Sequence, residues 1–421
     1  MECSFNPMSI EHHQRRFDFY PELLKSYPVY YSSAAGGWVV SRYADVNQVL
    51  TQHDNYSSSP QQGQGFGFAT GVDDNATPED MRRMQTLLSA LPFRMEELAN
   101  ANMLVSEDPP RHTAMRRVFS AAFRPGTIAS LEMSIRAIVA PCIEKMSSAQ
   151  EFDLLDGLAT QVPLQTIVTM LGADVGRVPE FKMWADELIT AAGGAERHTE
   201  AAEERYGRAL IEICQYFKPL IDERRANPGD DLISLVLKGQ DSDARVTDFE
   251  VVLFVILLFL AGSETTTNLI ANTVYQLLQD ERQLQQVVDN PSLIPNAIEE
   301  TLRFRSPVQQ IFRKTTCDTE LGGQTLPKDA LIILMLGATG FDESIWSNPD
   351  QYDVTREPRR NLGFGSGAHA CLGMNLGRLE ARAALEAVIP ELPNWKLAQP
   401  DNPMIDSFIV WGYQKLPLVR R

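Results

Sequence analysis

The sequence predicts a mainly α-helical protein with small β-sheets. Apolar residues recur at helical spacing in several stretches of residues 126–240, with breaks at turns that contain glycine or proline. Thr247 and Glu250 then have the spacing of a capping box, and the apolar run after them predicts a long helix that ends near Gln279. The strand-like runs, in contrast, are short and lie mainly outside this helical part of the chain.

Short strands are expected toward both ends of the chain. Pro28–Tyr31 and Trp38–Val40 flank the pair Gly36-Gly37, which indicates a β-hairpin, and Tyr43–Thr51 has the spacing of a helix. Further strands are expected in the C-terminal third, at Val308–Phe312, Cys317–Leu321, Gln324–Leu326, Ala330–Leu336 and, two or three of them, within Trp395–Val419. We therefore expect small sheets beside a larger body of helices.

Composition narrows the class of protein. A chain of 421 residues can hold two or three average domains or one large one. Its net charge of −17 argues against nonspecific binding to nucleic acid or to anionic membranes. The five cysteines are odd in number and widely spaced, which indicates a reducing compartment without disulfides.

No membrane segment is expected either. Residues 1–27 are interpreted as a leader with a short helix, because no apolar run follows their basic residues. The longest apolar run, Val251–Ala261, is too short to span a bilayer. The sequence thus predicts a cytoplasmic protein that does not bind membranes.

One cysteine stands in a setting that favours a thiolate. Cys371 lies near the end of the glycine-rich stretch Phe364–Gly373 (FGSGAHACLG), and an amphipathic helical pattern follows at once. Unpaired N–H groups and the helix dipole stabilise negative charge at such a position, and glycines let a flat cofactor approach the sulfur. A buried structural cysteine is the alternative for a cysteine considered alone.

This stretch resembles the haem-binding signature of the cytochrome P450 family, F-G-x-G-x-H-x-C-x-G. The match includes every defining position: Phe364, Gly365, Gly367, His369, Cys371 and Gly373. The resemblance implies haem b (iron protoporphyrin IX) as cofactor, with Cys371 as the metal ligand and with Phe364, Gly365, His369 and Gly373 around it. It also implies the P450 fold over residues 1–421 as a single domain, with haem between the long helix and the cysteine loop.

The long helix contains a polar break, Ala261–Thr266 (AGSETT), after an apolar first half. Glycine in a helix interior costs roughly 1 kcal/mol relative to alanine, so the break indicates a function; a tolerated glycine beside a solvated glutamate is the alternative. The run resembles the family's oxygen-activating segment. That resemblance implies that Gly262 leaves room for dioxygen, that Thr265 donates a hydrogen bond to the reacting oxygen, and that Glu264 relays protons to it.

A basic helix is expected after the stop at Asp108–Pro110. His112 and Arg116 lie four residues apart and so share one face of that helix. A solvated helix face is the alternative interpretation. The run resembles the family's D-P-P-x-H-x-x-x-R pattern, which implies that His112 and Arg116 bind haem propionates, and Arg313 matches a further propionate-binding position.

A structural ion network is expected around Glu300. Glu300 and Arg303 are spaced as in the family's E-x-x-R element, although this spacing alone is common on helices. The resemblance implies that Arg356 completes the network and that its role is structural. Two positions depart from the family: Phe341 stands where an arginine is usual, and Asn361 stands where a histidine near a propionate is frequent.

The substrate pocket is expected to be apolar. Residues 57–105 are interpreted as a long substrate lid, mostly irregular but with helical content in Met81–Met103, and Val178–Arg197 falls where the family has lid helices; a surface insertion is the alternative for 57–105. The other pocket walls are expected at Leu257, Ala261, Val308, Ile311, Phe408 and Ile409. Such walls favour a lipophilic substrate such as a terpenoid, steroid, fatty acid or polyketide intermediate.

Together these observations predict a haem-thiolate monooxygenase that hydroxylates or epoxidises such a substrate. The sequence has no flavin, iron–sulfur or nucleotide-binding signature. Electrons are therefore expected from a ferredoxin or similar carrier with its NAD(P)H-dependent reductase, docking on a basic patch at Arg111, Arg117, Arg359, Arg360, Arg378 and Arg382. The alternatives are a peroxide-using enzyme, an isomerase or reductase on the same scaffold, and a haem-binding sensor without turnover.

Overall fold

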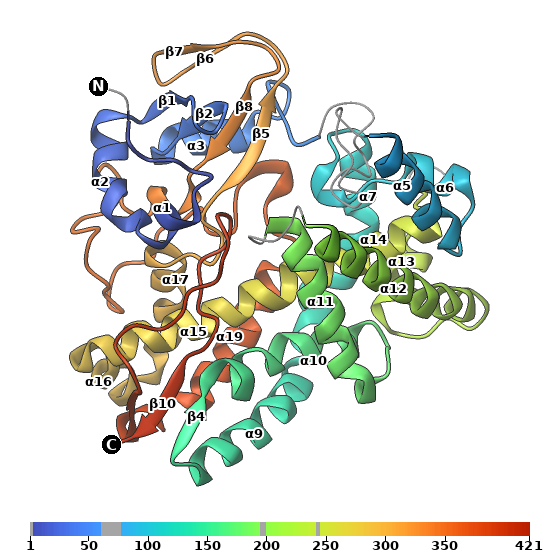
Figure 1. The fold of residues 1–421 in the computed structure, drawn as a ribbon. Helices are drawn as coiled ribbons and strands as arrows, with labels where there is room; N and C mark the ends of the chain where they lie inside the picture. The colour runs from blue at the N-terminus through green and yellow to red at the C-terminus, as the bar shows by residue number, and fades with distance from the viewer. Residues whose placement is uncertain (1–2, 60–76, 194–198, 241–244) are drawn as a thin grey trace. The chain divides into compact units, whose positions relative to one another are not determined.

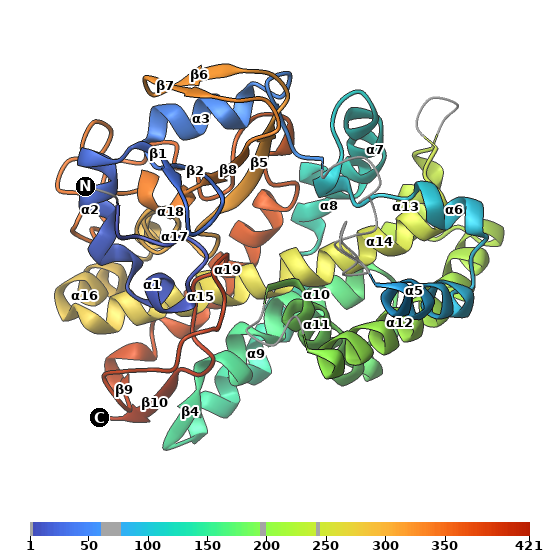
Figure 2. The same ribbon diagram turned by 45° about the horizontal axis from the view of Figure 1, so that its top comes forward.

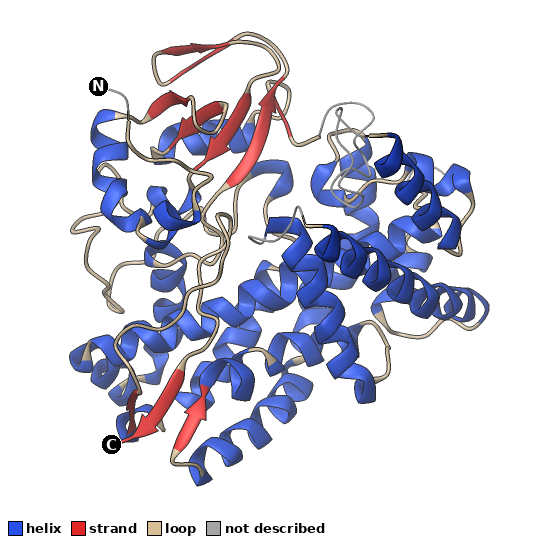
Figure 3. Ribbon diagram, in the orientation of Figure 1, coloured by secondary structure: helices blue, strands red, loops and turns tan. Residues whose placement is uncertain are grey.

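The structure is a computed structural model, and it describes residues 3–59, 77–193, 199–240 and 245–421. In this part of the chain helices dominate and the strands form three small sheets, which confirms the predicted fold class (Figure 1, Figure 3). The contacts define two compact units. We call them the sheet unit, Met1–Ser57, Pro125–Pro163 and Ser263–Arg421, and the helical unit, Ser58–Arg124 and Leu164–Gly262. A single domain over residues 1–421 stays a prediction.

The largest sheet has the strand order β1-β2-β8-β5-β3. Its strands are β1 (Val29–Ser32), β2 (Gly37–Val40), β8 (Leu331–Leu334), β5 (Ile311–Thr315) and β3 (Tyr56–Ser57). The first two strands pair antiparallel, with Val29 opposite Val40, so the predicted hairpin is confirmed. The strand predicted at Val308–Phe312 begins only at Ile311, because Val308 makes an isolated bridge to Val410 instead.

Helices cover both faces of this sheet. Alternate strand residues point to opposite faces, and Val40 and Leu334 join a core with α3 (Tyr43–Thr51), whereas Val39 and Ile333 join a core with α2. Figure 2 shows α3 and α2 on either side of the strands. The prediction of a helix at Tyr43–Thr51 is confirmed. The N-terminal segment forms two helices, α1 (Ile10–Gln14) and α2 (Arg16–Ser26).

The remaining strands are short. A three-stranded sheet has the order β4-β10-β9, and a hairpin joins β6 to β7. The bounds are β4 Glu151–Asp153, β6 Thr319–Leu321, β7 Gln324–Leu326, β9 Trp395–Leu397 and β10 Pro417–Arg420. The strands predicted near both ends of the C-terminal third are thus present, although the one expected from Cys317 starts two residues later.

Three helices of the sheet unit carry or flank the site residues. They are α15 (Glu264–Gln279), α17 (Ile294–Phe304) and α19 (Met374–Val388), and each packs on the other two. A further helix, α9 (Glu132–Ser148), packs on α19. A further helix, α16 (Glu281–Asp289), lies between α15 and α17 and was not predicted from the sequence.

The helical unit contains the region expected to be a lid. Residues 60–76 of this region lie outside the described residues. From residue 78 the chain forms α5 (Pro78–Ala90) and α6 (Met95–Asn100), so the expectation of an irregular segment is wrong there and the helical content predicted for Met81–Met103 is confirmed. Amphipathic spacing overrode the polar composition.

The other helices of this unit follow the predicted periodicity. Their bounds are α7 Arg111–Ser120, α11 Val178–Gly193, α12 Glu200–Ala226, α13 Leu232–Lys238 and α14 Asp248–Leu258, with α10, Gln161–Met170, shared between the units. Pro179 is the second residue of α11, where its missing N–H group costs nothing. Residues 194–198, the end of the second expected lid segment, lie outside the described part.

The long helix is present but changes its winding midway. Its capping box is confirmed, since Thr247 Oγ1 accepts from Glu250 N at 3.1 Å and Glu250 Oε2 accepts from Thr247 N at 2.8 Å. A π-helical turn, Phe259–Ser263, separates α14 from α15. The whole stretch of 32 residues is long and apolar enough to cross a membrane, but 61% of its most apolar window is buried in the protein, as in a core helix of a globular protein.

Candidate functional site

The cysteine loop is folded back on itself just before α19. Cys371 N donates to the carbonyl oxygen of Phe364 at 2.8 Å, which closes the loop. Gly373 is the N-cap of α19, so Cys371 stands three residues before the first helical residue, Met374, and its predicted place before a helix is confirmed. The Cys371 side chain is half-buried. A sulfur at this position is both reachable and close to a helix N-terminus, which favours the thiolate.

Other cysteines of the chain have a different environment. Burial raises the pKa of the Cys214 thiol to about 12, and burial also raises the pKa of Cys142. Both therefore stay protonated at neutral pH, which makes them poor metal ligands. Among the half-buried and exposed cysteines, only Cys371 lies in a glycine-rich loop before a helix in the described residues.

Two glycines of the loop have left-handed backbone conformations. Gly365 and Gly367 both have φ +69°, but only a side chain at Gly367 would overlap the carbonyl oxygen of Leu50 on α3. At Gly365 the nearest atom, His369 O, is 3.8 Å from the position that a Cβ atom would take, so that side of the loop is open. Gly367 thus fixes the loop against α3, and Gly365 leaves space for a flat group.

We expect Gly367→Ala to destabilise the protein more than Gly365→Ala. Both variants incur about 1–2 kcal/mol of backbone strain, and Gly367→Ala adds an overlap with backbone atoms that brings its cost to about 3 kcal/mol or more. Urea unfolding of the two variants side by side measures the difference. Equal stabilities would contradict the close packing of the loop on α3.

Side chains next to the loop tie it to α17. The Arg378 guanidinium lies 4.6 Å from the centre of the Phe364 ring and pairs with Glu299 of α17 at 2.6 Å. Asn361 Oδ1 accepts from Gly363 N at 3.0 Å, and its Nδ2 group donates to Glu299 at 3.2 Å. In this chain Asn361 therefore bridges the start of the loop and α17.

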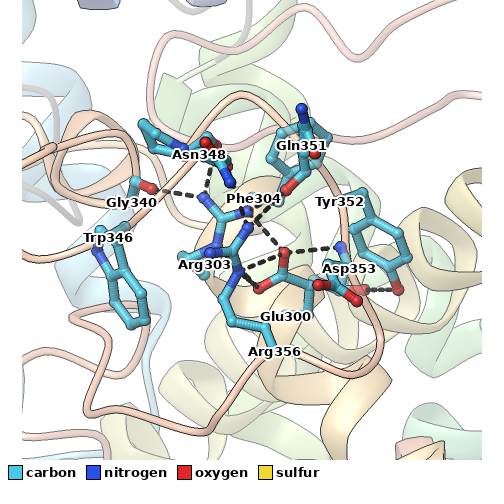
Figure 4. A network of polar contacts seen from close by, with 12 residues as sticks. Glu300, Arg303, Phe304, Gly340, Trp346, Asn348, Gln351, Tyr352, Asp353 and Arg356 are labelled. Atoms are coloured by element: carbon cyan, nitrogen blue, oxygen red, sulfur yellow. Dashed lines mark hydrogen bonds and ion pairs between the residues drawn. The ribbon is translucent and has the colours of Figure 1, made fainter.

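A buried ion network is centred on Glu300 of α17, as Figure 4 shows. Arg303 donates to the Glu300 carboxylate at 2.6 and 2.8 Å, and Arg356 donates to it at 3.1 Å. The side chains of Glu300 and Arg303 are 3% and 1% exposed. The structure thus brings together the three residues that the sequence analysis grouped.

The two arginines of the network also hold the segment 340–351. Arg303 donates to the carbonyl oxygens of Gly340, Pro349 and Gln351 at 2.6 to 2.8 Å (Figure 4). Next to Gly340, the Phe341 ring packs on Phe304 at 5.5 Å, within an aromatic cluster from α2 and α17. An apolar residue therefore fits the position where the family usually has arginine.

The break in the long helix is a π-helical turn with accessible residues beside it. Glu264 is the first residue of α15, and it is half-buried, as are Gly262 and Thr265, while Ala261 is exposed. The neighbouring Phe249–Ile256 stretch of the same helix is buried throughout. π-Helical turns inside α-helices occur frequently at functional sites.

The residues expected at the propionates belong to different units. His112 and Arg116 are on α7 of the helical unit, and Arg313 is on β5 of the sheet unit. His112 is 1% exposed, which excludes the alternative of a solvated helix face for this residue. Arg313 Nη1 donates to the carbonyl oxygen of Phe312 at 2.7 Å.

Two of the expected pocket walls lie side by side. Gln309 N donates to Ile409 O at 2.8 Å and Trp411 N donates to Pro307 O at 2.7 Å, so 307–311 runs beside 408–411. Val308, Ile311 and Ile409 are half-buried, whereas Phe408 is only 5% exposed. On the helical unit, Leu257 is half-buried beside the exposed Ala261.

Half of the expected basic patch takes part in ion pairs. Arg111 pairs with Glu107 and with the buried Glu250, and the other pairs are Arg378 with Glu299 and Arg382 with Glu132. These carboxylates offset the charge of three of the six arginines. The patch as a docking surface for an acidic carrier stays a prediction.

Comparison with known proteins decides the family. The model of the family described as "Cytochrome P450" matches residues 92–413. The chain belongs to the cytochrome P450 family. Putative cytochrome P450 YjiB of Bacillus subtilis is 30% identical to this P450 over 94% of this chain and 91% of that protein. Cytochrome P450 107B1 of Saccharopolyspora erythraea is 31% identical over 90% and 88% of the two chains.

Solved structures resemble this P450 along its whole length. CYP109E1 from Bacillus megaterium in complex with testosterone has a TM-score of 0.81 at 28% identity and covers 99% of this chain and 100% of its own. Cytochrome P450 CREJ in complex with (4-ethylphenyl) dihydrogen phosphate has a TM-score of 0.86 at 28% identity and covers 100% of both chains. P450BioI in complex with an acyl carrier protein ligated to hexadec-9Z-enoic acid has a TM-score of 0.84 at 28% identity, over 98% of this chain and 99% of its own.

Membership confirms the P450 fold, the class of enzyme and the cofactor. P450s are oxidoreductases of the haem-thiolate monooxygenase class, and haem is their cofactor. The residues present fit a haem: Cys371 is a reachable soft ligand before a helix, and the loop side at Gly365 is open. Ala261 and its half-buried neighbours provide accessible surface in the middle of an otherwise buried helix.

Proposed function

We propose that this P450 inserts one atom of dioxygen into a lipophilic organic molecule and reduces the other atom to water. The observation that carries the proposal is that the sheet unit contains both the half-buried Cys371, just before α19, and Glu264 and Thr265, on the first turn of α15. α15 and α19 pack on each other. Cys371 is suited to bind iron, and Glu264 and Thr265 are suited to transfer protons.

The residues around the haem have different roles in this proposal. The haem, when bound, supplies the iron chemistry of dioxygen cleavage, which thiolate donation favours. Cys371 holds the iron, Phe364, Gly365, His369 and Gly373 shape the loop around it, and His112, Arg116 and Arg313 bind the propionates. Gly262 leaves room on the helix, the Thr265 hydroxyl donates a hydrogen bond to the reacting oxygen, and the Glu264 carboxyl passes protons to it.

The substrate is proposed to be lipophilic because the expected walls are hydrocarbon. They are Leu257, Ala261, Val308, Ile311, Phe408 and Ile409. Solved relatives hold a steroid in one case and a fatty acid on a carrier protein in another. Steroids and long-chain fatty acids are therefore the first classes to examine, and terpenoids and polyketide intermediates follow.

Electrons are proposed to come from a separate carrier in the cytoplasm. The chain itself has no flavin-binding, iron–sulfur or dinucleotide-binding motif in its sequence. A ferredoxin with an NAD(P)H-dependent reductase can supply the two electrons that the reaction needs. The ion pairs of Arg111, Arg378 and Arg382 leave the docking surface to be located by experiment.

Isotope labelling tests the proposal. The purified haem protein is combined with a ferredoxin, its reductase and NADPH, and testosterone and palmitic acid serve as probes under ¹⁸O₂. We expect a product with one ¹⁸O atom and NADPH consumption that rises with substrate. Faster turnover with hydrogen peroxide alone would favour the peroxide-using alternative, and a rearranged product without ¹⁸O would favour an isomerase.

A further inference from the structure

The N-terminal helices contact both segments that are proposed to line the substrate pocket. These segments, 307–311 and 408–411, lie side by side through two backbone hydrogen bonds of 2.8 and 2.7 Å. Three buried residues of α1 and α2 reach them: His13, Arg16 and Tyr20. All of these residues belong to the sheet unit. From the sequence, this part of the chain was expected to be only a leader with a short helix.

Tyr20 holds the first segment through Gln309. The Tyr20 hydroxyl donates to Gln309 Oε1 at 2.5 Å, and both residues are 0% exposed. Burial raises the pKa of Tyr20, so the hydroxyl stays protonated and remains a donor. Gln309 Nε2 donates to Ser306 O at 2.6 Å, and a side chain at Gly337 would overlap the Gln309 amide. The Gln309 side chain is therefore held by Tyr20, Ser306 and the close approach of Gly337. Its backbone N donates a hydrogen bond to Ile409 O.

His13 lies beside Phe408 of the second segment and is linked to Gln310 of the first through Pro7. Its Nε2 atom lies 2.6 Å from Pro7 O, which also accepts from Gln310 Nε2 at 3.0 Å. The imidazole ring lies 6.4 Å from the Phe408 ring, which in turn lies 6.4 Å from Phe312 on β5. Burial, together with nearby positive charge, lowers the pKa of His13 to about 3, so the ring is neutral and Nε2 donates to Pro7 O.

Arg16 holds the far end of the second segment. Its guanidinium lies 4.9 Å from the centre of the Trp411 ring, and its Nε atom donates to the carbonyl oxygen of His13. The next residue, Phe17, meets Trp411 edge-on at 4.7 Å and is covered by the Arg305 guanidinium at 3.7 Å. Arg16 is 1% exposed and has no carboxylate partner among the described residues. Its charge is therefore directed at the Trp411 ring.

We propose that His13, Arg16 and Tyr20 are positioning residues of the substrate pocket, which hold 307–311 and 408–411 in place and thereby set the pocket's shape. The inference rests on the proposed function, because that function assigns the two segments to the pocket. A role in packing alone needs no polar contacts at these places, since buried polar groups stabilise less than apolar groups of the same shape. The polar contacts are directional: the Tyr20 hydroxyl donates to Gln309, the Arg16 guanidinium lies over Trp411, and His13 shares the acceptor Pro7 O with Gln310.

Tyr20→Phe tests the positioning role, because it removes only the hydroxyl that binds Gln309. Tyr30→Phe is its matched control. The Tyr30 hydroxyl donates to Phe5 O at 3.0 Å, which lies outside both segments. The readout is the ratio of the dissociation constants of 4-phenylimidazole and imidazole, obtained from the shift of the haem absorption band. The ratio reports pocket shape because haem loading affects both ligands equally. We expect Tyr20→Phe to change it by roughly threefold to tenfold and Tyr30→Phe to leave it unchanged.

A second variant, His13→Phe, covers the case in which Tyr20→Phe does not fold. It keeps an aromatic ring against Phe408 but loses the hydrogen bond to Pro7, and we expect the same change in the ratio. Hydrogen exchange of the haem-loaded protein adds an independent readout. The amides of Gln309 and Trp411 should exchange faster in both variants.

The outcomes separate this inference from the proposed function. A lower melting temperature with an unchanged ligand ratio and unchanged amide exchange would overturn the positioning role and leave a purely structural one. A changed ratio in Tyr30→Phe as large as in Tyr20→Phe would overturn it too. If the wild-type protein had no thiolate ligand on the haem iron, the proposed function would be overturned instead. The spectrum of the carbon monoxide complex shows this before any ligand ratio is measured.

Discussion

Glu300→Gln is expected to lower the free energy of unfolding by about 4 kcal/mol, because it leaves the buried Arg303 and the half-buried Arg356 without their shared counter-ion. The Glu300 carboxylate accepts hydrogen bonds from Arg303 at 2.6 and 2.8 Å and from Arg356 at 3.1 Å (Figure 4). Glutamine has nearly the same shape, so the loss is one of charge. Urea unfolding followed by circular dichroism measures it. Since domains are stable by about 5–15 kcal/mol, we also expect little haem-loaded protein.

Glu180→Gln is the matched control. Glu180 pairs with Arg177 at the same helical spacing of three residues, but both side chains are more than a third exposed, at 47% and 38%. Exposed ion pairs contribute little to stability, so this variant should unfold at the wild-type urea concentration. If both glutamine variants unfolded alike, the buried network would not be what holds the segment leading to the cysteine loop.

Thr265→Ala is expected to uncouple oxygen consumption from product formation. The variant should still consume NADPH and dioxygen but release mostly hydrogen peroxide, with at least a tenfold fall in product per NADPH, about the low end of what a positioned proton donor contributes. The reason is that Thr265, on the first turn of α15, is the residue proposed above to donate a hydrogen bond to the reacting oxygen. Product, peroxide and NADPH are measured in the same reaction.

Thr267→Val controls for the loss of a hydroxyl from the same helix. The Thr267 hydroxyl is buried and donates to the carbonyl oxygen of Ala159 at 3.2 Å, so it has a structural partner. We expect this variant to keep the wild-type coupling, even if it is somewhat less stable. Wild-type coupling in Thr265→Ala, in contrast, would exclude the role given to Thr265.

Local signals predicted the parts of the fold that local chemistry determines. The cap at Thr247 and the hairpin at Gly36-Gly37 follow from side-chain hydrogen bonds and turn geometry within a few residues. The place of Cys371 before α19 follows in the same way from glycines and an amphipathic pattern. The resemblance to the P450 family then supplied the cofactor and the grouping of distant motifs.

Contacts between distant residues could not be predicted from the sequence. Tyr20 and Gln309 are 289 positions apart, and neither has a neighbour that signals the hydrogen bond. The ion pairs within the expected basic patch were missed for the same reason: Arg378 pairs with Glu299, which is on another helix. The expectation of an irregular lid was wrong from residue 78 onward, because the amphipathic spacing that predicted helical content in Met81–Met103 outweighed the polar composition, and α5 and α6 form there.

The central claim is that Cys371 binds the haem iron as a thiolate. The absorption spectrum of the reduced, carbon monoxide-bound protein tests it most directly, with wild type beside Cys371→Ser and Cys142→Ser as the control for a buried cysteine. We predict a strongly red-shifted Soret band in wild type and in Cys142→Ser, and its loss in Cys371→Ser. A folded, haem-loaded wild-type protein without that band, or a Cys371→Ser variant that keeps it, would contradict the account.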